Sequence, residues 1–195
     1  MLTPLTQEEK SILLRLAREG VMAAVNEREP PAIDIETLPP RLRALGASFV
    51  TLTCGDQLRG CIGTLKVDLP LAEDVRSHAI AASTRDYRFS PIQADELDNL
   101  EIEVSVLSTP HPLDYHSVDD LIESLRPGTD GVILKHGVHR ATFLPQVWKK
   151  IPDPESFLET LCEKAHLPSD AWRTENLQVL IYQVDSFHEP ALPKS

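Results

Sequence analysis

Residues 58–65, LRGCIGTL, combine side chains that could do chemistry with glycines that weaken a strand. Arg59 and Cys61 are two positions apart, and residues at that spacing in a strand point to the same face. A guanidinium beside a thiol favours the thiolate, which is the nucleophilic form of cysteine. Gly60 and Gly63 favour a bulge, or the close approach of a ligand or another backbone. If no bulge separates Arg59 from Cys61, the pattern predicts a cleft near both side chains.

A structural role for the same strand is the alternative, and from spacing alone it is the commoner one. A cysteine in a strand is most often a small buried hydrophobe. An arginine two residues away often pairs with a carboxylate on a neighbouring strand. Both interpretations of Cys61 and Arg59 therefore stay open at the level of sequence.

Two further regions could contribute to the cleft. Asp86, Arg88 and Phe89 follow a predicted helix and could bring a cation near the LRGC strand, although a structural salt bridge at the helix end is an equal alternative. Glu103 alternates with apolar residues and could face the same cleft, whereas a solvated strand face is its commoner role.

The spacing of the metal-binding residue types argues against a metal site. The three cysteines are scattered, and Cys54 and Cys61 are seven positions apart, which is not a usual zinc-ligand spacing. His136 and His139 flank a two-residue turn, where histidines are usually solvated. The sequence contains no glycine-rich phosphate loop, no serine elbow and no HExxH. We therefore expect neither a metal nor a cofactor.

Charge and hydropathy exclude other classes. The 30 acidic residues exceed the 19 basic ones and give a net charge of −11, which disfavours nucleic acid and anionic membranes as partners. The first residues resemble no signal peptide, and no apolar run has the ~20 residues of a membrane span. An odd, small number of cysteines predicts reduced thiols and a cytoplasmic location.

Capping signals and helical periodicity predict three main helices. Thr6 followed by Glu9 has the capping-box spacing and opens a helix over residues 7–27. Asp68 or a neighbour would cap a helix near residues 70–83, and Asp153 precedes a third near residues 154–166.

Alternation and turn residues predict antiparallel strands. The expected pieces are a hairpin over 47–54 and 58–67, a strand over 100–106, a hairpin over 131–136 and 139–144, and a last strand over 177–184. Because helices and hairpins do not alternate regularly, the predicted class is α+β with a mainly antiparallel sheet flanked by helices. At 195 residues the chain fits a single domain over 1–195, with a smaller lobe inside it and a loose tail over 189–195.

The LRGCIGTL segment resembles the signature of the AmmeMemoRadiSam system protein A family, also called the AMMECR-type domain. Supporting blocks follow in the family's order: ASFVTL (47–52), RDYRFSPI (85–92), LEIEVSVLS (100–108), GVILKHG (131–137), FLPQVW (143–148) and FLETLCEKAHL (157–167). The resemblance covers most of the chain. One departure is His166, where the family pattern predicts glycine.

This resemblance implies an α+β fold with a larger lobe and a smaller subdomain. It also implies association with a radical-SAM protein and a Memo-like protein. We expect a component of such a metabolic system that binds a small anionic molecule along the LRGCIG strand. The candidate residues are Cys61 for catalysis and Arg59, Gly60, Ile62, Gly63, Arg88 and Glu103 for ligand binding. The alternative is a non-catalytic scaffold or protein-interaction module in which this strand is structural.

Overall fold

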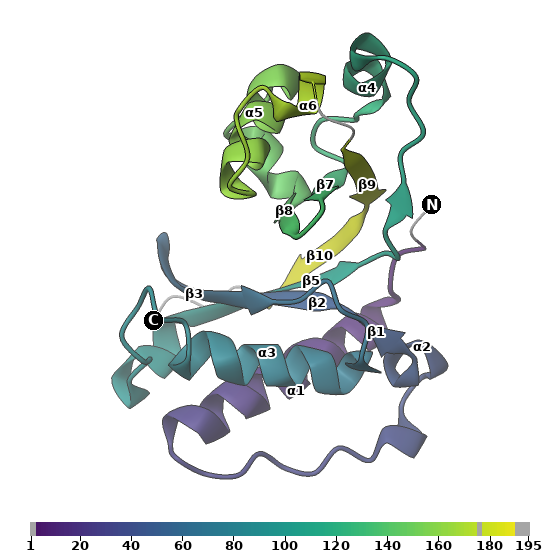
Figure 1. Ribbon diagram of the computed structural model, residues 1–195. Coiled ribbons are helices and arrows are strands. Elements are labelled where there is room, and N and C mark those ends of the chain that lie inside the picture. Colours follow the sequence, from purple (N-terminus) through teal and green to yellow (C-terminus); the bar gives the residue numbers. More distant parts are fainter. Residues whose placement is uncertain (1–2, 175–176, 190–195) are drawn as a thin grey trace. The chain divides into compact units, whose positions relative to one another are not determined.

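The computed structural model describes residues 3–174 and 177–189, and the chain forms two compact units. The larger unit contains residues 3–107 together with the strand that follows residue 184, and the smaller unit contains residues 108–184. Each unit has an antiparallel sheet and flanking helices (Figure 1). The predicted α+β class, with a larger and a smaller part, is confirmed.

The larger unit is built on a four-stranded antiparallel sheet in the order β10-β5-β2-β3. A short ribbon of β1 and β4 lies beside it. The elements are α1 (Gln7–Val25), η1 (Ile35–Thr37), α2 (Pro40–Arg43), β1 (Leu45–Gly46), β2 (Ser48–Cys54), β3 (Gln57–Gly63), β4 (Leu69–Pro70), α3 (Leu71–Thr84), η2 (Ala94–Asn99), β5 (Leu100–Leu107) and β10 (Val184–His188).

Helices α1 and α3 cover one face of this sheet (Figure 1). The apolar positions that alternate along β2 and β5 point to that face, and those of the helices face back, so one core forms between the two layers. The capping box predicted at Thr6 and Glu9 is present, with both reciprocal hydrogen bonds. The sheet's other face is turned away from these helices and contains the polar members of the same alternation.

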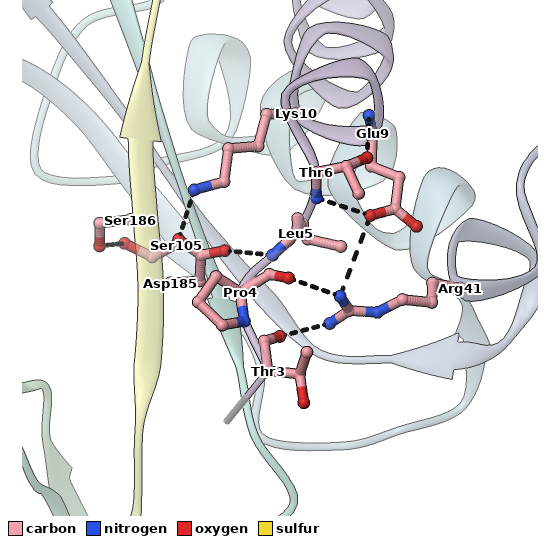
Figure 2. A network of polar contacts seen from close by, with 10 residues as sticks. All are labelled: Thr3, Pro4, Leu5, Thr6, Glu9, Lys10, Arg41, Ser105, Asp185 and Ser186. Carbon is pink, nitrogen blue, oxygen red and sulfur yellow. Dashed lines mark hydrogen bonds and ion pairs between the residues drawn. The ribbon is translucent and has the colours of Figure 1, made fainter. Parts of the chain in front are cut away.

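Polar contacts tie the N-terminal segment to α1, α2 and β10 (Figure 2). Asp185 of β10 accepts hydrogen bonds from the backbone N–H of Leu5 and from Nζ of Lys10, at 2.7 and 2.8 Å. Arg41 of α2 donates to the carbonyls of Thr3 and Pro4, both at 2.8 Å. The last described strand of the chain is therefore fixed to the beginning of the first helix.

The smaller unit has its own sheet in the order β6-β9-β7-β8. Its elements are β6 (His111–Pro112), α4 (Val118–Ser124), β7 (Gly131–His136), β8 (His139–Phe143), η3 (Pro145–Lys149), α5 (Pro154–Lys164), α6 (Ala171–Thr174) and β9 (Gln178–Tyr182). The predicted hairpin around residues 137–138 is confirmed. Helix α5 begins after Asp153, whose carboxylate accepts from the N–H of Ser156 as its capping role requires.

Stacked aromatic rings and a buried carboxylate organise this second core. The rings of Trp148 and Phe157 stack with centroids 3.6 Å apart. The indole N–H of Trp148 donates to the carbonyl of Asp130, whose fully buried carboxylate pairs with Arg126. Burial raises the pKa of the Tyr182 hydroxyl to about 12.

Three boundaries differ from the sequence prediction. The last strand is not continuous, because the chain leaves β9 after Tyr182 and enters a different sheet as β10. The second strand of the first hairpin ends at Gly63 rather than at residue 67. Asp68 is not a helix cap, because Leu69 and Pro70 pair with β1 and Pro70 occupies the N-cap position.

The beginning of the predicted loose tail is held in place. The N–H of Glu189 donates to the carbonyl of Ile102, and its carboxylate pairs with Arg18 of α1. Residues 190–195, the rest of that predicted tail, lie outside the described residues.

Candidate functional site at the edge strand β3

The LRGCIG segment forms β3, the edge strand of the larger sheet. Cys61 is opposite Thr51 of β2, and Gly60 is opposite Leu52. The next pair joins Thr53 to Leu58, so Arg59 is an additional residue and the register shifts there. This is the geometry of a β-bulge, in which two residues of one strand oppose a single residue of the other.

The bulge changes the expected position of Arg59. The strict alternation that placed Arg59 beside Cys61 is interrupted, and the guanidinium instead forms a bidentate pair with Glu96 of η2, at 2.6 and 3.0 Å. The hydrogen bonds from Arg59 hold the pKa of Glu96 below its usual range. Arg59 therefore fastens η2 to the edge strand.

The RDYRF segment holds the backbone of Cys61 from outside the sheet. The carboxylate of Asp86, 2% exposed, accepts the Cys61 N–H at 2.9 Å. Nη2 of Arg88 donates to the Cys61 carbonyl at 3.1 Å, and the same guanidinium forms a bidentate pair with Asp86. These bonds from Arg88 hold the pKa of Asp86 far below its usual range, although burial acts in the opposite direction. The predicted approach of Arg88 to the LRGC strand is thus present, through the peptide groups of Cys61.

The side chain of Cys61 points to the sheet face away from α1 and α3 and is half-buried. Its sulfur accepts a hydrogen bond from Oγ1 of Thr51, at 3.3 Å. On the other side of Thr51 the register places Glu103 of β5. Because paired residues share a face, Cys61, Thr51 and Glu103 form a row across three strands, with Glu103 two strands (about 10 Å) from Cys61.

Three of the remaining candidate residues have packing roles. A Cβ atom on Gly60 would lie 2.1 Å from the carbonyl oxygen of Ala82, so this glycine lets the end of α3 touch the strand backbone. A Cβ on Gly63 would lie 2.3 Å from the ring of Phe49. Ile62 points to the helix side and packs against the core. The close backbone approach predicted at Gly60 therefore comes from α3.

The two other thiols differ from Cys61 in their surroundings. Cys54 lies on the helix side of β2, and burial followed by the charge of Glu96 raises its thiol pKa. Cys162 is fully buried on α5, and burial raises its pKa as well. Neither of these thiols is suited to nucleophilic chemistry at neutral pH.

Sequence reasoning missed two residues that shape this region and one buried cluster. Thr51, which lies in the ASFVTL block, and Glu96, which lies in none of the quoted blocks, both support the edge strand. Ser48 of β2 donates to Asp74 of α3 at 2.6 Å, and Nδ1 of His78 lies 3.2 Å from the same carboxylate oxygen. The i, i+4 spacing of Asp74 and His78 was the available signal. Since Ser48 and Asp74 are buried, this cluster joins α3 to β2 inside the fold.

The described residues contain no group of three or more His, Cys, Asp or Glu side chains arranged to hold a metal ion. Of the two turn histidines, His139 uses Nδ1 to contact the carbonyl of Ala165 at 3.0 Å. In residues 3–174 and 177–189, none of the helices is long and apolar enough to cross a membrane.

The fold and the edge strand define a class: an α+β protein of two units whose glycine-bearing edge strand is held by an aspartate–arginine pair. The chain belongs to the AMMECR1 family, whose model matches residues 14–187.

A protein from Thermofilum pendens is 41% identical, over 95% of this chain and 92% of that protein. A protein from Methanothermobacter thermautotrophicus is 37% identical, over 95% and 97%. Among solved structures, the uncharacterized protein PH0010 from Pyrococcus horikoshii is 33% identical, covers 95% of this chain and 93% of its own, and has a TM-score of 0.85.

Proposed function

We propose that this protein is a component of a multi-protein metabolic system with a radical-SAM protein and a Memo-like protein, and that it binds a small anionic molecule beside β3. The observation that carries the proposal is the setting of Cys61. Its backbone is fixed on both sides by Asp86 and Arg88, while its half-buried sulfur accepts a hydrogen bond from Thr51. Fixing a reactive group before the ligand arrives lowers the cost of binding and orientation.

The two arginines differ in their access to an anion. The side chain of Arg88 is 45% exposed, and that of Arg59 is 19% exposed. Both guanidinium groups already have a carboxylate partner, so an anion would be attracted by the remaining exposed edge of Arg88 rather than by an unpaired charge. In this proposal Arg88 orients the ligand, and Arg59 keeps the strand in position.

Charge-selective alkylation tests this proposal. Iodoacetate and iodoacetamide differ mainly in charge, so their rate ratio at Cys61, followed by peptide mass spectrometry, reports the local attraction for anions. We expect Cys61 to react before Cys54 and Cys162, with a higher iodoacetate-to-iodoacetamide ratio than free cysteine shows.

The Arg88→Gln variant should lower that ratio. Arg85 is an exposed arginine beside the Asp86–Arg88 pair, and the Arg85→Gln variant should leave the ratio unchanged. The proposal fails if Cys61 reacts only after unfolding, or if its ratio is no higher than that of free cysteine.

The second candidate function is a non-catalytic scaffold, favoured by the packing roles of Gly60 and Gly63 and by the carboxylates that already pair with both arginines. Mixing the purified protein with a radical-SAM protein and a Memo-like protein from the same cell, followed by light scattering, tests the partners. Two results together would favour the scaffold: the Cys61→Ser variant still forms the complex, and Cys61 of the wild-type protein is not alkylated selectively.

A further inference from the structure

A row of polar side chains crosses the sheet of the smaller unit. The register pairs Lys135 of β7 with Arg140 of β8 on one side and with Gln178 of β9 on the other. Residues that pair directly share a face, whereas the adjacent Leu134 belongs to the hydrophobic core on the α5 side. The three polar side chains therefore lie side by side on the face turned away from α5. At about 4.8 Å between strands, the row spans about 10 Å.

Two of these side chains are cations that oppose each other directly. The Cβ atoms of such cross-strand pairs are about 5 Å apart, and like charges at that spacing destabilise a sheet. The Lys135 ammonium and the Arg140 guanidinium form no hydrogen bond or ion pair within residues 3–174 and 177–189. Elsewhere in the smaller unit, by contrast, Arg126 and Arg173 each pair with a carboxylate. An anion that contacts both opposed cations would therefore relieve their repulsion.

The surroundings of the two cations also favour a negatively charged ligand. No carboxylate projects from the other described strand positions on this face, which are Pro112, Gly131, Ile133, Thr142, Leu180 and Tyr182. In the row next to the cations, Ile133 and Leu180 are buried. Electrostatic attraction is stronger beside such apolar surface than in open water. The row is therefore a positively charged site on a protein whose net charge is −11.

The hairpin fixes the spacing of the two cations. Strand β7 is an inner strand, paired with β9 on one side and with β8 on the other. The turn after β7 contains Gly137 with a φ of 58°, and on the opposite face Nδ1 of His139 contacts the carbonyl of Ala165. The two cations are thus spaced by the strand ladder before a ligand binds, which lowers the cost of binding.

We propose that this row binds a phosphate group, either as inorganic phosphate or as part of a small phosphorylated molecule. A phosphate monoester has a charge of about −1.5 to −2 at pH 7, which matches two cations. The Arg140 guanidinium can donate two parallel N–H groups to two phosphate oxygens, and the Lys135 ammonium acts as a point charge. The carboxamide of Gln178 adds a neutral N–H donor. All three residues belong to the smaller unit, so this inference does not depend on the proposed function at β3.

Titration of the full-length protein with inorganic phosphate, followed by the amide chemical shifts of Lys135, Arg140 and Gln178, tests the site. Glycerol 3-phosphate is titrated in parallel, and acetate at the same ionic strength is the control for a monovalent anion. We expect saturable shifts with both phosphates and none with acetate. Equal affinities would indicate recognition of phosphate alone, and tighter binding of glycerol 3-phosphate would indicate a phosphorylated molecule. Either result supports the phosphate site.

Variants of Arg140 assign the binding to the row. Arg140→Gln should weaken phosphate binding about threefold to tenfold, because one of the two cations is lost. Arg140→Lys, which keeps the charge, should lose less affinity. Lys150→Gln, which removes an exposed charge elsewhere in the smaller unit, should bind phosphate like the wild type.

Urea unfolding provides a second measurement on the same proteins. Without phosphate, Arg140→Gln should have a higher urea midpoint than Arg140→Lys, because only the glutamine removes the repulsion from Lys135. Added phosphate should raise the midpoint of the wild type more than that of Arg140→Gln. Shifts that do not saturate, or that acetate reproduces, would overturn the proposal. Phosphate binding by Arg140→Gln as tight as that of the wild type would overturn it as well.

Discussion

Most of the residues around β3 hold the strand in place, whereas the side chain of Cys61 points to the sheet face away from α1 and α3. Gly60 makes room for α3, and Asp86 holds the N–H of Cys61. The Cys61 side chain itself is half-buried. The glycine and the cysteine of one motif thus belong to opposite faces of the sheet.

Substitution of Gly60 by alanine should destabilise the larger unit by about 1–3 kcal/mol, because the added Cβ meets backbone that cannot rotate away. The free energy of unfolding from urea titration measures the effect. Leu58→Ala, at a position 40% exposed on the same strand, is the control and should change stability by less than about 1 kcal/mol. Equal losses in the two variants would contradict the packing role of Gly60.

Substitution of His166 by glycine should stabilise the protein by about 0.5–1 kcal/mol. His166 has a φ of 59° just after α5, in the left-handed region that glycine adopts without strain. This conformation gives a physical reason for the glycine that the resemblance predicts at this position. Thermal unfolding measures the change, and Glu159→Gly, inside the same helix, should instead destabilise by about 1 kcal/mol. A loss of stability in the His166→Gly variant would contradict the proposed backbone strain at His166.

At the scale of elements, the three main helices begin in three different ways. Helix α1 starts with a complete capping box, α5 starts with a capping aspartate, and α3 starts directly from a paired strand. The three helices therefore depend on local side chains to different degrees.

Thr6→Ala should destabilise the larger unit by about 1 kcal/mol, because the N–H of Glu9 loses its acceptor. The cap also lies next to the contacts that hold β10 (Figure 2), so hydrogen exchange in residues 185–189 should rise in the same variant. Ser11→Ala, an exposed position one turn further along α1, should change stability by less than about 0.5 kcal/mol. If exchange in residues 185–189 stays as in the wild type, the cap and β10 are not coupled.

For the whole molecule, we expect the carboxyl groups whose pKa values are lowered in the fold to govern the response of stability to acid. Asp86 and Glu96 have lowered pKa values, caused first by hydrogen bonds from Arg88 and Arg59 respectively. A carboxyl group whose pKa is lower in the folded state stabilises the fold above its unfolded pKa of about 4. That contribution is lost as the pH falls toward the folded value.

The protein should therefore lose stability between about pH 5 and about pH 3, with urea midpoints as the measurement. The variants Asp86→Asn and Glu96→Gln should be less stable than the wild type at neutral pH. Their free energy of unfolding should fall less over this interval, because each variant lacks one carboxyl group whose protonation is coupled to unfolding. Asp95→Asn, which removes an exposed charge from the same 3-10 helix as Glu96, should follow the wild type. If the urea midpoints of the wild type and the three variants change with pH in parallel, protonation of Asp86 and Glu96 is not coupled to stability.

The sequence by itself determined the local elements of this protein. Periodicity placed α1, α3 and α5 within a few residues, the capping residues Thr6 and Asp153 marked two helix starts, and alternation located β5. These features depend on neighbours a few positions apart, so the signal and the interaction lie in the same short window. The family was also determined at this level, because ordered motifs are a property of the chain.

Tertiary structure alone decided the surroundings of the candidate site. The bulge at Arg59 appears only when β2 and β3 pair, and it directs the arginine to Glu96, 37 positions away. The partner of Gly60 is a helix carbonyl from residue 82. The division of residues 177–188 between β9 and β10 likewise depends on which sheet each strand joins. Such contacts between distant segments leave no periodic trace, because their geometry is set by strand register and layer packing rather than by the identity of adjacent residues.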